Sequence, residues 1–159
     1  MTNDEVWSAV VRWLRARTGV TTIKAHESGQ APALPYVMVN LLGIFEVRQH
    51  EMDVEYSGDT EITETPVIEA EWRFSVHAYG GSPTDILRPI VSAVKLAQIM
   101  EPLMPGLVIH EISQIRSVPD WINEQWQPRA QMDLNVRGLI KDGHVIDVIE
   151  EAPLDIERA

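Results

Sequence analysis

Two stretches of the sequence, residues 69–79 and 129–139, alternate strictly between apolar and polar side chains. This alternation is typical of a β-strand with one buried face, because successive side chains point to opposite sides. The apolar positions are Ala70, Trp72, Phe74, Val76 and Ala78 in the first stretch and Ala130, Met132, Leu134 and Val136 in the second. Two such strands need a second layer over their apolar face, and this requirement constrains the fold more than any other feature.

Two helices are predicted to supply that layer. Residues 3–18 place a stripe of side chains at three- and four-residue spacing, made of Val6, Val10, Trp13, Leu14 and Arg17. The second helix is predicted to begin at Ser82-Pro83-Thr84-Asp85, a capping pattern, and to continue to about Glu101. Pro89 either kinks this helix or marks its true first turn.

Shorter strands are expected around these elements, at residues 20–26, 36–47 and 107–118. Lys141-Asp142-Gly143-His144 predicts a hairpin turn, because Asp-Gly readily adopts positive backbone dihedral angles, and residues 145–149 then return as an edge strand. The order helix, strands, helix, strands predicts an α+β fold. We expect one domain over residues 1–159: an antiparallel β-sheet with two main helices packed on one face, an extended hairpin arm, and a flexible acidic tail at about 152–159.

Residues 48–68 differ in character from their surroundings, because acidic residues alternate there with apolar ones. One interpretation is a solvated loop. The other, which we favour, is a long acidic arm joining two strands. The only turn signal in its middle is Ser57-Gly58-Asp59, so the arm could be one hairpin folded at that point.

The charge of the chain argues against sequence-specific nucleic-acid binding. Acidic residues number 24 against 13 basic ones, which gives a formal net charge of −11, and phosphate binding needs clustered Lys and Arg. The absence of cysteine excludes disulfides, thiolate metal ligands and a cysteine nucleophile. The first residues lack a signal-peptide pattern, and no stretch approaches the ~20 apolar residues that cross a bilayer. We therefore expect a soluble protein made in the cytoplasm, with no membrane partner.

The acidic residues and histidines are the candidate catalytic groups of this chain. Glu69 and Glu71 share one strand face with His77, as a metal-dependent nuclease would require, but Arg73 lies between them. The five histidines lack the spacing of metal ligands, and no phosphate-binding or nucleophile motif is present. The sequence thus predicts no enzyme, no metal and no cofactor.

The tryptophans divide into two groups. Trp13 and Trp72 lie on apolar faces and are predicted to be core. Trp121 and Trp126 lie in a loop bounded by Pro119 and Pro128. Large aromatic residues in such a loop either fold back onto the domain or anchor a partner, since interface cores are enriched in them.

Four stretches, taken in order, resemble the neck or tail-terminator (tail completion) proteins of tailed bacteriophages. They are the helix at residues 3–18, the strand opening Pro35-Tyr36-Val37-Met38-Val39, the strand at residues 70–80 that runs into a helix, and the closing strand opened by Trp126-Gln127-Pro128-Arg129. Together they span roughly residues 3–140. None is a catalytic signature, so the resemblance is one of pattern and order.

The resemblance implies a structural virion protein of the neck, assembled in the host bacterial cytoplasm. Such subunits form a ring, usually a hexamer, that caps the tail tube and joins it to the head connector. In contractile tails the ring also contacts the sheath. DNA can pass through the lumen of such a ring, and we hypothesise that an acidic wall lets it slide without sticking.

The resemblance carries no catalytic residues, so the candidate site is an interface with copies of the chain or with partners. By position we expect contacts from the arm and from the loop that contains the two tryptophans, namely Arg48, Glu51, Asp53, Glu55, Glu61, Glu64, Trp121 and Trp126. Arg129 matches a recurrent arginine of the family and is expected to form a buried or inter-subunit ion pair. Arg48 and Arg116 are further candidates for that role.

Three alternatives stay open. The nearest is a head-completion or stopper protein of the same neck. From a different class, a soluble module could bind a basic partner through the acidic arm. The least favoured is a metal-dependent nuclease that uses Glu69 and Glu71.

Overall fold

The computed structural model describes residues 1–48, 53–100, 103 and 106–147. Within these residues one eight-stranded sheet is built around a single long strand, β4 (Ile62–Tyr79). Its main path is β1 (Thr21–Lys24), β2 (Tyr36–Glu46), β4, β9 (Arg129–Lys141) and β5 (Val108–Ile112). Three short strands join it: β3 (Asp53–Ser57), β6 (Arg116–Ser117) and β10 (His144–Ile146). All pairs are antiparallel except β1 with β2.

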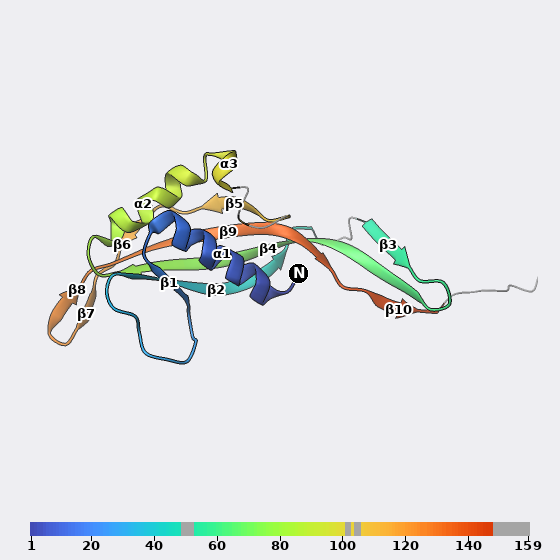
Figure 1. The fold of residues 1–159 in the computed structure, drawn as a ribbon, viewed down its shortest axis with the longest axis horizontal. Coiled ribbons are helices and arrows are strands. Elements are labelled where there is room, and N and C mark those ends of the chain that lie inside the picture. Colours follow the sequence, from blue (N-terminus) through green and yellow to red (C-terminus); the bar gives the residue numbers. More distant parts are fainter. Residues whose placement is uncertain (49–52, 101–102, 104–105, 148–159) are drawn as a thin grey trace, which may run out of the picture.

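The two alternating stretches pair with each other as the central strands β4 and β9, from Tyr79 opposite Arg129 to Val67 opposite Lys141. Their apolar residues lie on one face and are buried together with Val37 and Val39 of β2. This face needs cover, which the helices provide, so the predicted α+β class with helices on one sheet face is confirmed (Figure 1).

The first helix, α1 (Asn3–Thr18), buries the apolar residues of its predicted stripe against this face, including Trp13, while Arg17 is only half-buried. A capping box between Thr2 and Glu5 fixes its start, and Gly19 ends it in the left-handed conformation (φ 73°). The indole of the buried Trp72 donates to Asn3 Oδ1 at 3.0 Å, which ties α1 to the central strand.

The second predicted helix is divided into α2 (Pro83–Ala93) and α3 (Ala97–Met100), so the expectation of one helix to Glu101 was wrong. After Val94 the backbone bonds tighten, since Lys95 and Leu96 donate three residues back, and this change ends the helix. The break allows the carbonyl of Ile99 to accept from the Trp13 indole at 3.0 Å. Pro89 lies inside α2, which continues past it.

Residues 53–67 form the predicted hairpin, together with β10. β3 and the first residues of β4 fold back on each other around Gly58, whose φ is +99°. A Cβ at Gly58 would lie 2.0 Å from the carbonyl oxygen of Glu61, so only glycine fits this turn. The arm, defined as residues 53–67 with 144–146, projects from the body of the molecule (Figure 1).

The predicted hairpin at Asp142-Gly143 was wrong. β10 does not fold back on β9 but continues along the same edge of β4, because Lys141 pairs with Val67 and His144 with Glu64 in one register. The interruption between β9 and β10 falls opposite Pro66, which has no N–H to donate to the ladder. Residues 142–143 therefore form no turn. They lie between two strands that pair with the same edge of β4, and the missing N–H of Pro66 interrupts that pairing.

The expected strand at residues 107–118 is interrupted between β5 and β6, where Ser113 exchanges hydrogen bonds with Asp133. The expected loop at 119–128 contains a second, two-stranded sheet, β7 (Asp120–Ile122) with β8 (Gln125–Gln127). This hairpin lies at the opposite end of the long axis from the arm (Figure 1).

Candidate functional site

The arm presents its acidic side chains to solvent. Asp53, Glu55 and Glu61 are exposed, and Glu64 is half-buried in the ladder. Glu55 accepts from Lys141 Nζ at 2.9 Å, an exposed ion pair between β3 and β9. Arg48 is exposed just after β2, and Glu51 lies outside the described residues. The structure thus brings most of the predicted arm residues together on one projecting element.

The two loop tryptophans do not fold back onto the domain. Trp121 and Trp126 face each other across the β7–β8 hairpin with ring centroids 5.1 Å apart in an edge-to-face arrangement. Their exposed fractions are 60% and 66%. The turn between them is formed by Asn123 and Glu124, whose φ angles are 51° and 61°, as a two-residue hairpin turn requires. We call this element the tryptophan hairpin (residues 120–127).

Arg129 fixes the base of the tryptophan hairpin. Its Nη1 donates to both carboxylate oxygens of Asp120 at 3.2 Å, and its Nη2 donates to Nδ1 of His77 at 2.8 Å. The guanidinium also lies 5.5 Å from the centre of the Tyr79 ring. The predicted ion pair of Arg129 therefore forms within the chain, and its predicted role between subunits stays a prediction.

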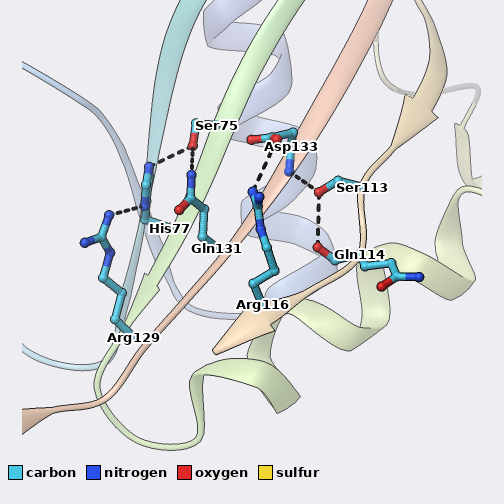
Figure 2. A network of polar contacts seen from close by, with 8 residues as sticks. All are labelled: Ser75, His77, Ser113, Gln114, Arg116, Arg129, Gln131 and Asp133. Atoms are coloured by element: carbon cyan, nitrogen blue, oxygen red, sulfur yellow. Dashed lines mark hydrogen bonds and ion pairs between the residues drawn. The ribbon is translucent and has the colours of Figure 1, made fainter. Parts of the chain in front are cut away.

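A buried polar row lies on the sheet face opposite the helices (Figure 2). Because Nδ1 of His77 accepts from Arg129, the neutral ring carries its proton on Nε2 and donates to Ser75 Oγ at 2.8 Å. Gln131 donates to the same oxygen at 3.0 Å. Burial, together with the neighbouring Arg129 cation, lowers the pKa of His77. This row connects the centre of the sheet to the tryptophan hairpin.

Arg116, another predicted interface residue, belongs to the adjacent part of this face (Figure 2). It donates from Nη2 to Asp133 at 3.3 Å, and both side chains are about half exposed. The backbone N–H of Asp133 donates to Ser113 Oγ at 2.7 Å. The pair is open to solvent, so its contribution to stability is small.

The carboxylates considered for metal binding are directed at arginines. Glu71 is buried and accepts from Arg73 at 2.8 Å and from Arg137 at 3.3 Å. The hydrogen bond from Arg73, with the contribution of Arg137, lowers the pKa of Glu71. Glu69 lies 3.9 Å from Arg137. Among the described residues, no three acidic, histidine or cysteine side chains are placed to hold a metal ion.

Two further surfaces were not foreseen from the sequence. A hollow of about 330 Å³ beside the base of the arm is lined by Glu69, Gly106, Val108, His110, Arg137, Gly138 and Leu139. Val108 and Leu139 are 60% and 43% exposed there. On β2, the outer edge beyond Val39 has no strand paired to it among the described residues, and Leu42, Ile44 and Phe45 are exposed.

The sequence contained only partial signals for these sites. The symmetric placement of Trp121 and Trp126 about Asn123-Glu124 indicates a hairpin. From that hairpin, Asp120 could have been predicted as the partner of Arg129. The hollow could not, because its lining residues on β5 and β9 are brought together only by the pairing of these two strands. In the described ranges, no helix has the length and apolar character to cross a membrane.

The fold is similar to that of a terminator from a contractile assembly. The matching chain is described as the sheath/tube terminator, in the extended state, of the extracellular contractile injection system PVC; the TM-score is 0.55 and the identity 12%. The match covers all of this chain, which spans 64% of the length of that chain. A second solved chain matches at a TM-score of 0.31 and 13% identity, over 87% of this chain and 96% of its own, and carries no argument. No curated protein sequence matches significantly.

The family is shown by sequence. The model of the phage neck terminator protein family matches residues 4–158, nearly the whole chain, so the protein belongs to that family. This confirms the resemblance seen in the four sequence stretches.

Proposed function

We propose that this protein terminates a phage tail by forming a ring of identical subunits, expected to be a hexamer, on the head-proximal end of the tail tube. Membership of the phage neck terminator family supports the role, and the similarity to a sheath/tube terminator supports the fold. The ring would halt tube growth and present its other face to the head connector.

The observation that carries this proposal is the arm. It is a three-stranded ribbon, β3–β4–β10, in which both outer strands have no further strand paired to them among the described residues. Unpaired strand edges offer rows of N–H and C=O groups that invite pairing with another chain. A ribbon without helical cover is marginal in isolation. We therefore expect the arm to lie against a neighbouring subunit.

The further partners follow from the position of the ring. The tube protein would contact one face, the connector the other, and in a contractile tail the sheath would contact the rim. DNA would pass through the lumen, and the net charge of −11 would keep its phosphates from adhering. The protein would then reside in the virion, after assembly in the host cytoplasm.

The mass of the purified protein in solution tests ring formation directly. Light scattering with native mass spectrometry should give one closed oligomer, and sixfold stoichiometry would support the hexamer. A stable monomer at high concentration would contradict the ring and would favour an acidic binding module.

Particles made without this protein test the terminator role. Tails of uncontrolled length are the expected result, because nothing would halt tube growth. Tails of normal length that fail to join heads would instead assign the protein to the stopper role.

A further inference from the structure

The tryptophan hairpin is a small sheet of its own, joined to the main sheet at a pair of prolines. The pairing of β6 with β9 stops at Ser117 and Ala130, and β7 with β8 resumes three residues further along each strand in the same register. Pro119 and Pro128 therefore stand opposite each other at this break, and each lacks an N–H that a neighbouring strand could use. A two-stranded ribbon is marginally stable by itself. The contacts that cross the break thus decide whether the hairpin is held.

The side chain of Arg129 crosses the break. The N–H of Val118 donates to the Arg129 carbonyl at 2.9 Å on the side of the main sheet. From there the guanidinium donates from Nη2 to His77 Nδ1 at 2.8 Å (Figure 2) and from Nη1 to both carboxylate oxygens of Asp120 at 3.2 Å. Its Nε is buried and has no acceptor within the described part of the chain. Arg129 therefore links one partner in the sheet to one partner in the hairpin.

The link to the sheet depends on the protonation state of His77. The neutral ring accepts through Nδ1, because its single proton is on Nε2 and is donated to Ser75 Oγ at 2.8 Å. A protonated ring carries N–H groups on both nitrogens, so Nδ1 could no longer accept from Arg129. Two cations would also face each other across this short distance. Adding one proton converts an attractive contact into a repulsive one.

Charged groups of both signs surround His77. Arg129 and Asp133 act on it from β9, Arg116 from β6 and Asp120 from β7. The uncharged Met38 of β2 lies opposite it, and the Tyr79 ring is stacked beside it on its own strand. Arg116 is paired with Asp133, whereas Arg129 touches the ring directly. Burial, together with Arg129, lowers the pKa of His77 below 6.5, so the ring is neutral at pH 7.5 and takes up its proton in acid.

We propose that His77 and Arg129 form an acid-sensitive latch for the tryptophan hairpin. With His77 neutral, Arg129 holds the hairpin at the end of the sheet. With His77 protonated, Arg129 leaves the ring and keeps only its partly exposed pair with Asp120, which contributes little by itself, so the hairpin loosens.

The latch acts within one chain and does not require the proposed ring. Its consequence concerns Trp121 and Trp126, whose side chains are exposed on the hairpin. A loosened element loses more conformational entropy when it binds. Any contact that these two side chains make should therefore weaken in acid.

Hydrogen–deuterium exchange of the full chain at pH 7.5 and pH 5 tests the latch. After correction for the intrinsic effect of pH on exchange, protection of the amides in residues 120–127 should fall at least tenfold at pH 5. Protection of residues 70–78, in the centre of β4, should stay unchanged. Nitrogen NMR of the His77 ring gives its titration midpoint directly, and the loss of protection in the hairpin should follow that midpoint.

Two variants act on opposite ends of the latch. His77→Asn should keep the hairpin protected at both pH values, because its side-chain carbonyl accepts from Arg129 and does not titrate. Asp120→Ala removes the partner in the hairpin, so protection should be low at both pH values. His144→Asn, at an exposed histidine on β10, is the matched control and should respond to pH as the natural protein does. Circular dichroism would check that each variant is folded.

Each remaining outcome overturns the latch. A hairpin that stays protected at pH 5 although His77 has titrated would show that the ring does not hold it, and a ring that stays neutral down to pH 5 would show that the device does not operate. A full response to pH in His77→Asn would assign the effect to another group. Equal losses in residues 70–78 would assign it to unfolding of the whole chain. Should His77→Asn fail to fold, a hairpin fully protected in Asp120→Ala at pH 7.5 would overturn the latch by itself.

Discussion

Arg129 Nη1 lies 3.2 Å from both carboxylate oxygens of Asp120, so one guanidinium joins the end of the central sheet to the tryptophan hairpin. Asp120→Asn should reduce the free energy of unfolding by about 1 kcal/mol or less, because the pair is partly exposed. Arg129→Met should cost more, since it also leaves His77 Nδ1 without its donor.

Chemical denaturation of both single variants and the double variant would measure the coupling between the two residues. Tryptophan fluorescence should report a looser hairpin in each variant. Equal losses in Asp120→Asn and Arg129→Met would show that the contact with His77 contributes nothing.

Stability should fall as the pH is lowered below about 6.5. The pKa of His77 is lowered from its ordinary value of 6.5 by burial and by Arg129, so the folded protein keeps this ring neutral while the unfolded chain takes up a proton. The contribution is present above pH 6.5 and is lost as the pH falls toward the folded pKa. Urea denaturation between pH 5 and 7.5 should show the slope, and His77→Gln should flatten it. The exposed His144→Gln is the matched control, and an equal slope in His77→Gln would refute this assignment.

Trp72 should be the most costly core position to truncate. It is fully buried at the centre of β4, and its indole donates to Asn3 of α1. Trp72→Ala should lower the free energy of unfolding by about 3–5 kcal/mol, since it removes a large buried side chain and leaves a cavity. Trp72→Phe should cost less. The exposed Phe45→Ala provides a comparison in denaturation experiments, and a similar loss there would contradict the account of the core.

Gly58→Ala should affect the arm and leave the body unchanged. A Cβ at this position would collide with the Glu61 carbonyl at 2.0 Å, so the turn must open, and the atoms nearest to it belong to Glu61 and Ile62 of the arm. The midpoint of thermal unfolding should therefore change little, while the oligomer seen by light scattering should be depleted. Ser57→Ala, at the neighbouring exposed position, should form the oligomer normally. Normal assembly of Gly58→Ala would contradict the prediction, because it would show that ring formation does not depend on the turn of the arm.

The central fold was predictable because period-two alternation specifies which side of a strand is buried. Trp72 and Met132 could be placed in the core from their neighbours alone, and both are fully buried. The stripe around Val10 and Trp13 identified the covering helix for the same reason. Local periodicity is sufficient where one face of an element meets the core.

Where pairing between distant segments decides the structure, local patterns failed. Asp142-Gly143 has the chemistry of a tight turn, yet the chain stays extended because β4 offers a continuous edge from Tyr79 to Ile62. The site was foreseen in part: the arm and Trp121–Trp126 were selected as residues, but the hairpin geometry and the hollow depend on tertiary contacts. The helix predicted to Glu101 ended early because the backbone bonds tighten after Val94, and the contact of Trp13 with Ile99 across this break was not visible in the local pattern.

β4 runs without interruption for 18 residues from the tip region of the arm into the buried core. Its hydrogen bonds to β2 and β9 lie across the strand direction, so a pull along the arm loads many of them at once in shear. Peeling them one by one would need a force in another direction. Tension on the arm is therefore carried directly by the interior of the subunit, with no hinge between the two.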